Sequence, residues 1–144
     1  MNNMRKLGLD YGDSRIGVAI TDLLGITAQG LETIHHHGND KIALKRLDEI
    51  LNSYEIDTIV IGMPINMDGT KTERVEITNQ FIHKLKCRFP KVSIEIVDER
   101  LTTVAAHKTM NYLNVNKNQK RNIVDTISAV YILETYMNKR KNEN

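Results

Sequence analysis

The stretch that decides the fold is residues 7–21, LGLDYGDSRIGVAIT. Residues 7–11 and 16–21 are apolar strand patterns, and the polar segment between them, Gly12 to Arg15, suits a hairpin turn. Residues 31–36 could add a third antiparallel strand. The sequence therefore predicts that the chain begins with a meander of three strands.

Helical and strand patterns alternate after this meander. Apolar residues recur at helical spacing from Ala43 to Tyr54, and a short β-branched run follows at residues 56–62. A second helix is predicted from Ile77 to Phe89, and another buried strand over residues 92–98. The predicted fold class is α/β, with a mixed five-stranded sheet in which an antiparallel meander is continued by parallel strands and helices cover both faces.

The C-terminal part contains two more predicted helices, one reaching Leu113 and one running from about Asn122 to Met137. The chain has 144 residues, of which 40% are hydrophobic, and this size is usual for one domain with a proper core. Residues 1–138 are therefore predicted to form a single domain, followed by a polar, basic tail at 139–144.

Three carboxylates stand at the ends of predicted buried elements. Asp10 closes the first strand, Glu99 follows the strand at 92–98, and Asp125 lies near the start of the last helix. Burying a carboxylate without a partner costs several kcal/mol, and several together cost more unless a divalent cation neutralises them. The pattern indicates hydrolysis at phosphate, for which two Mg²⁺ or Mn²⁺ ions roughly 4 Å apart would activate water and neutralise charge.

The identity of the acidic ligands leaves alternatives open. Asp98 competes with Glu99, because adjacent residues of a strand face opposite ways and at most one would point at the metals. Asp125 could simply complement the macrodipole in a first helical turn. However, Ser128 and Ala129 are small enough to let the last helix approach the sheet closely, which would bring its carboxylate near the other two.

Candidate nucleic-acid contacts must be argued from position, because the formal net charge of +2 is too small to indicate such binding. The loop before the second helix would place phosphate at a helix N-terminus, and a polar loop before the last helix carries three cations. Two arginines beside the carboxylates could be phosphate contacts or structural ion-pair residues. The predicted contacts are Arg15, Thr70, Lys71, Thr72, Arg74, Arg100, Lys117, Lys120 and Arg121.

The three adjacent histidines at residues 35–37 suggest a metal site at first sight. Adjacent histidines at a strand end cannot all face one ion. A solvated turn is the preferred interpretation of this segment.

Three blocks, at residues 7–19, 62–69 and 98–103, resemble the YqgF (RuvX) family. The first and third blocks together are specific, and the three blocks together with the helix that carries Asp125 span nearly the whole chain. The resemblance implies an RNase H-like fold, as in Holliday junction resolvases, and a nuclease with proposed roles in maturing the 5′ end of pre-16S rRNA or in resolving four-way DNA junctions. It also implies that the three carboxylates described above match the acidic triad of the family.

The function predicted on these grounds is a metal-dependent nuclease that acts on structured nucleic acid, with precursor ribosomal RNA, alone or in ribosomal precursor particles, as the first choice of substrate. A junction resolvase is the alternative, and it would be expected to act as a two-fold dimer, whereas an RNA-trimming enzyme could be a monomer or a homodimer. A nucleotide-binding phosphotransferase and a non-catalytic nucleic-acid-binding module are further alternatives. The sequence has no apolar signal core and no run of membrane length, so a cytoplasmic protein without a membrane partner is expected.

Overall fold

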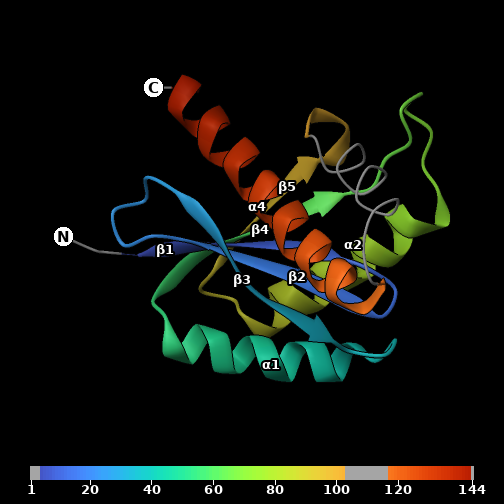
Figure 1. Ribbon diagram of the computed structural model, residues 1–144, viewed down its shortest axis with the longest axis horizontal. Helices are drawn as coiled ribbons and strands as arrows, with labels where there is room; N and C mark the ends of the chain where they lie inside the picture. Colours follow the sequence, from blue (N-terminus) through green and yellow to red (C-terminus); the bar gives the residue numbers. More distant parts are fainter. Residues whose placement is uncertain (1–3, 103–116, 144) are drawn as a thin grey trace.

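The computed structural model describes residues 4–102 and 117–143, with the backbone alone for 117–124 and 143. Within these residues, five strands form one mixed sheet in the order β3-β2-β1-β4-β5 (Figure 1). The meander consists of β1 (Arg5–Tyr11), β2 (Arg15–Thr21) and β3 (Ala28–His35), which pair antiparallel. The strands β4 (Ile56–Met63) and β5 (Ser93–Asp98) continue the sheet in parallel with β1. The predicted mixed sheet is confirmed.

Helices cover both faces of this sheet, as predicted. α1 (Asp40–Ser53) and α2 (Glu73–Arg88) pack on one face, and α4 (Lys117–Glu143) crosses the other, in contact with all five strands (Figure 1). A single 3-10 turn, η1 (Glu99–Leu101), follows β5 directly. α4 begins at the end of the sheet where β1 and β4 finish, and it runs back toward the end where β2 turns into β3 (Figure 1).

The two faces of the sheet carry side chains of different size. The face toward α1 and α2 is lined by large residues such as Leu9 and Ile61, which form the main core with Phe81 of α2. The face toward α4 carries the smaller Ala19 and Val60. Small side chains leave room for α4 to lie close to the strands.

Glycines bring α4 into contact with the backbone of the sheet. A Cβ atom on Gly17 of β2 would lie 1.9 Å from the backbone oxygen of Asp125. A Cβ atom on Gly8 of β1 would lie 2.9 Å from the backbone oxygen of Ala129. Real Cβ atoms essentially never come this close to another atom, so both positions require glycine as long as α4 keeps its place.

α4 is longer at both ends than the sequence predicts. It begins at Lys117 rather than near Asn122, so the basic cluster that contains Lys120 and Arg121 lies in its first turns and not in a loop. The prediction of a loop is wrong because lysine, glutamine and arginine are good helix formers despite their polarity. At the other end, residues 139–143 continue the helix instead of forming a frayed tail, and their cations favour a helix C-terminus. The helix expected to reach Leu113 lies outside the described residues.

Candidate active site

Asp10 and Asp125 lie next to each other at the end of β1. Asp10 is the register partner of Gly17 on β2, and partners across two antiparallel strands share one face of the sheet. Asp125 lies directly over Gly17, since its backbone oxygen fills the space of a Cβ atom there. Both residues are buried, with 5% of Asp10 and 8% of Asp125 exposed. The absence of a side chain on Gly17 therefore lets α4 bring the buried residue Asp125 next to the buried residue Asp10.

Glu99 approaches from the other side of Asp10. On β4, Ile61 is in register with Leu9 of β1, and Gly62 follows it just as Asp10 follows Leu9. A Cβ atom on Gly62 would lie 2.8 Å from Oε1 of Glu99, so this carboxylate lies over Gly62 on the α4 face. Asp10 is thus flanked by two glycines, one under Asp125 and one under Glu99.

Asp98, the alternative to Glu99, forms an ion pair with Arg100. Its carboxylate accepts hydrogen bonds from the backbone N of Arg100 at 2.9 Å and from Nη2 of the same residue at 2.7 Å. These bonds, above all those from the side chain, hold the pKa of Asp98 below its usual range. Arg100, for which the sequence left two roles open, is an ion-pair residue here. Of the two adjacent acids, Glu99 is the one that lies on the same face as Asp10.

Arg15 supplies a positive charge to the buried carboxylate on α4. Its Nε donates to Oδ2 of Asp125 at 2.8 Å, and the two side chains are only 23% and 12% exposed. A guanidinium in this position compensates the charge of a carboxylate that would otherwise be costly to bury. The sequence left Arg15 open between an ion pair and a phosphate contact, and in the structure it forms the ion pair.

The donor chemistry of the three carboxylates suits a hard divalent cation, because Mg²⁺ and Mn²⁺ prefer carboxylate oxygens. Asp10, Glu99 and Asp125 come from three different elements and face the same end of the sheet. In residues 4–102 and 117–143, however, no three histidine, cysteine or acidic side chains are grouped closely enough to hold a metal ion. The elements therefore bring the donors to one place, and side-chain rotations would have to complete a metal site.

Arg74 is fixed to the turn that follows Asp10. Its guanidinium pairs with the carboxylate of Asp13, and Nη2 donates to the backbone oxygen of Tyr11 at 3.0 Å. α2 is thereby tied to the turn between β1 and β2. Arg74 was predicted as a phosphate contact, and here its contacts are with the protein itself.

In the loop before α2, Thr70 is hydrogen-bonded within the loop, and the two residues after it are exposed. The hydroxyl of Thr70 donates to Oδ1 of Asp68 at 2.6 Å, and the backbone N of Thr70 donates to the same atom at 2.9 Å. Lys71 and Thr72 are exposed, and Thr72 stands at the N-cap of α2 without a side-chain capping bond. Thr70 is exposed as well, but its hydroxyl and backbone N already donate to Asp68.

His36 was wrongly predicted to lie in a solvated turn. It is 1% exposed, and its Nδ1 accepts from the backbone N of Gly38 at 3.1 Å while Nε2 lies 2.9 Å from the backbone oxygen of Gly12. Its ring stacks on that of Tyr11, with 5.6 Å between centroids. His36 therefore packs under Tyr11 and binds the backbone of Gly12, in the turn that follows Asp10. No sequence pattern predicted this contact.

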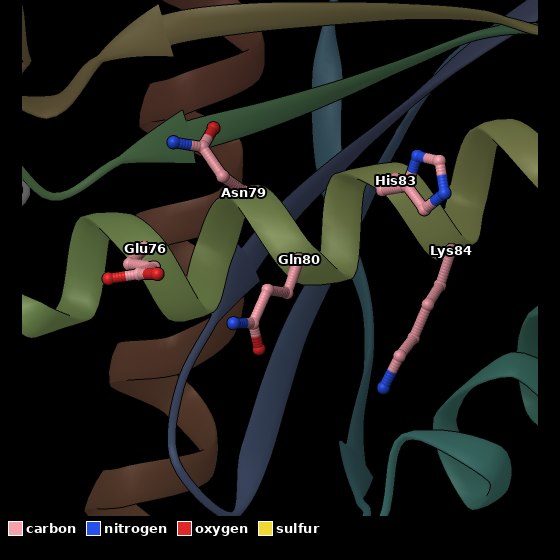
Figure 2. A pocket seen from close by; sticks show the side chains of 5 residues that line it. All are labelled: Glu76, Asn79, Gln80, His83 and Lys84. Atoms are coloured by element: carbon pink, nitrogen blue, oxygen red, sulfur yellow. The ribbon is translucent and has the colours of Figure 1, made fainter.

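A hollow of about 510 Å³ lies along α2 and is lined by none of Asp10, Glu99 and Asp125 (Figure 2). Its side chains come from one helix and point in different directions, so they do not converge on one ligand (Figure 2). One of them, Lys84, pairs with Asp40 of α1 at 2.9 Å. The lining residues are Glu76, Asn79, Gln80, His83 and Lys84.

Comparisons with known proteins agree on one family. The family model described as "RuvX: Holliday junction resolvase" matches residues 4–139. The "Putative pre-16S rRNA nuclease" of Ruminiclostridium cellulolyticum is 54% identical over 136 residues, which cover 94% of this chain and 95% of that protein. The protein of the same name from Acetivibrio thermocellus is 48% identical and covers 95% of this chain and 97% of its own.

Among solved structures, the RuvC protein of T. thermophilus in complex with a Holliday junction substrate is similar in fold. It superposes with a TM-score of 0.62 and covers 96% of both chains, at 11% sequence identity. A likeness at this identity concerns the fold. The predicted RNase H-like fold is confirmed.

Proposed function

The chain belongs to the RuvX family of nucleases, and on this premise we propose that it hydrolyses phosphodiester bonds with divalent metal ions bound by Asp10, Glu99 and Asp125. The observation that supports the proposal is that the three residues lie on the α4 face at one end of the sheet, where two glycines leave room beside Asp10. Bound Mg²⁺ or Mn²⁺, as a pair, would activate the attacking water and neutralise the phosphate.

The residues around the carboxylates suit a nucleic-acid backbone. Lys71 and Thr72 are exposed at the N-terminus of α2, where backbone amides and the helix dipole favour phosphate. Lys117, Lys120 and Arg121 are the cations of the first turns of α4, the helix that carries Asp125 further along. A substrate strand lying across the carboxylates could therefore be held at its phosphates from both helices.

The proposed substrate is the 5′ end of pre-16S rRNA, free or in ribosomal precursor particles. The support is the name shared by relatives that are 54% and 48% identical over nearly the full chain. Such a role would place the protein in the cytoplasm. In the described part of the chain, no helix is both long and apolar enough to cross a bilayer.

The second candidate function is the resolution of four-way DNA junctions in recombination and repair. It is favoured by the description of the matching family model as a Holliday junction resolvase. The same carboxylates would serve either substrate, because the chemistry at the phosphate is the same. A resolvase has to cut two strands symmetrically, which favours a two-fold dimer, whereas RNA trimming needs no such symmetry.

The test compares cleavage of an end-labelled RNA carrying the pre-16S 5′ leader with cleavage of a synthetic four-way DNA junction, each with Mg²⁺ or Mn²⁺. Asp10→Asn should abolish cleavage, because it removes the charge of the central carboxylate. Asp57→Asn is the matched control, since Asp57 pairs with Lys6 at 3.1 Å at the other end of the sheet. Its activity should equal that of the wild type.

Metal-dependent trimming of the RNA alone would support the ribosomal role, and symmetric nicking of the junction alone would move the assignment to resolvase. If neither substrate is cut, and Asp10→Asn binds both as tightly as the wild type, the protein is a binding module and the catalytic proposal is wrong.

A further inference from the structure

The turn between β2 and β3 is held in one conformation by Asp22. Its Oδ1 accepts from the backbone N of Ile26 at 2.8 Å, and its Oδ2 accepts from the hydroxyl of Thr27 at 3.1 Å. The backbone N of Gly25, a residue with φ of 70°, donates to the backbone oxygen of Asp22 at 3.1 Å. These bonds, led by that from Ile26, hold the pKa of Asp22 below its usual range and tie the turn together.

This ordered turn presents apolar side chains to solvent. Leu23 is 53% exposed, Leu24 79% and Ile26 68%. Single exposed apolar residues are common, but a contiguous group on an ordered turn is typical of an interaction site. In residues 4–102 and 125–142, for which exposure is described, no other stretch of four residues carries three large exposed apolar side chains.

Basic residues at the end of α4 border the same surface. Gly25 and Ile26 line a hollow of about 290 Å³ together with Met137, Arg140 and Lys141. The turn and the C-terminal end of α4 lie at one end of the molecule, and α4 begins at the opposite end, where β1 finishes (Figure 1). A molecule bound here would leave the carboxylates free.

We propose that this apolar–basic surface, formed by Leu23, Leu24, Ile26, Arg140 and Lys141, docks a partner protein through a segment that combines apolar residues with aspartate or glutamate. The apolar side chains of the segment would cover the turn, and its acids would pair with the cations of α4. The proposal does not depend on which nucleic acid the carboxylates cleave.

Two other occupants fit this surface less well. A single-stranded nucleic acid would find cations, but none of the five residues that form this surface is aromatic, so its bases would have no ring among them on which to stack. A second copy of the chain would bring two sets of cations, Arg140 and Lys141, toward each other. Three apolar side chains also cover far less than the roughly 800 Å² per partner of a stable protein interface. A short acidic and apolar segment suits both the size and the charge.

The test is selection of short random peptides displayed on phage against the full-length protein. The enriched peptides should combine leucine, isoleucine or phenylalanine with aspartate or glutamate. Their affinity, measured by fluorescence anisotropy, should fall about tenfold or more in Leu24→Asp and in Arg140→Glu. Met67→Asp is the matched apolar control because Met67 is also 79% exposed, and Lys86→Glu on α2 is the charge control.

Each of the following results would overturn the proposal. The selection could enrich no peptide that prefers the wild type to Leu24→Asp, or it could enrich basic or wholly polar sequences. Leu24→Asp could instead abolish self-association in sedimentation, which would make the surface a contact between copies. It could also weaken binding of single-stranded RNA, which would make the surface part of a nucleic-acid site. Thermal unfolding of every variant checks that the fold is retained.

Discussion

Replacing Gly17 by alanine tests whether the close approach of α4 sets the position of Asp125. The new Cβ atom would stand 1.9 Å from the backbone oxygen of Asp125, whereas ordinary contact begins at 3.4 Å. A backbone atom cannot rotate out of the way, so α4 has to retreat by about 1.5 Å at this point, the difference between the two distances.

This displacement should affect activity more than folding. A misplacement of about 1 Å in a catalytic group can cost about 100-fold in rate, so we expect Gly17→Ala to cleave at least about 100-fold more slowly. Overpacking of this kind costs about 1–3 kcal/mol in the free energy of unfolding, which lowers the melting temperature by several degrees. The variant should therefore fold and bind nucleic acid, yet cleave poorly.

Gly8→Ala is the matched control. Its Cβ atom would meet the backbone oxygen of Ala129 and Cβ of Leu133, both at 2.9 Å, so it also presses on α4 but with a smaller overlap and one turn or more beyond Asp125. The assay is single-turnover cleavage of the best substrate, with urea unfolding of each variant. If Gly17→Ala keeps activity within about threefold of the wild type, or loses no more than Gly8→Ala, the inferred role of the close approach is refuted.

Three further variants test the surroundings of the carboxylates. Arg15→Gln removes the positive charge that pairs with Asp125. Because that charge repels a cation and competes for the carboxylate, the variant should bind Mn²⁺ about tenfold more tightly in an electron paramagnetic resonance titration; unchanged or weaker binding would contradict this. Arg100→Gln should lower stability at neutral pH. The lowered pKa of Asp98 in the folded state contributes stability above its unfolded pKa that is lost as pH falls through the folded value, so urea unfolding should show the difference between variant and wild type shrinking below about pH 4. Gly62→Ala places a Cβ atom 2.6 Å from Cδ1 of the buried Ile132 and 2.8 Å from Oε1 of Glu99, so it should slow cleavage about tenfold and also lower stability, by about 1–3 kcal/mol; full activity would argue against Glu99 as a ligand.

The architecture of the sheet is predictable because its strands alternate or bury apolar residues in short runs. Residues 56–62 and 92–98 were predicted as strands, and β4 and β5 differ from these bounds by one residue each. The start of α4 was not predictable in the same way. Residues 117–121 carry no apolar stripe, and their helical preference is visible only in propensity, which is a weaker signal than periodicity.

Most of the residues around the three carboxylates could not be predicted, because their contacts are made between segments far apart in the sequence. The small side chains Ser128 and Ala129 did indicate that α4 could lie close to the sheet, and both are fully buried. The sequence could not show that Gly8, Gly17 and Gly62 lie under α4 or Glu99, because these contacts depend on which strands are neighbours in the sheet. The partner of Arg15 lies 110 residues away along the chain, and nothing local distinguishes that ion pair from a phosphate contact.

The position of α4 at the far end of the chain has a consequence for biosynthesis. A protein is made from its N-terminus, so the whole sheet leaves the ribosome before α4 does. Until α4 arrives, the sheet lacks the cover over Ala19 and Val60, and only two of the carboxylates have been made. Asp125 therefore joins Asp10 and Glu99 only when α4 packs on the sheet, so the three carboxylates come together only after the whole sheet has been made.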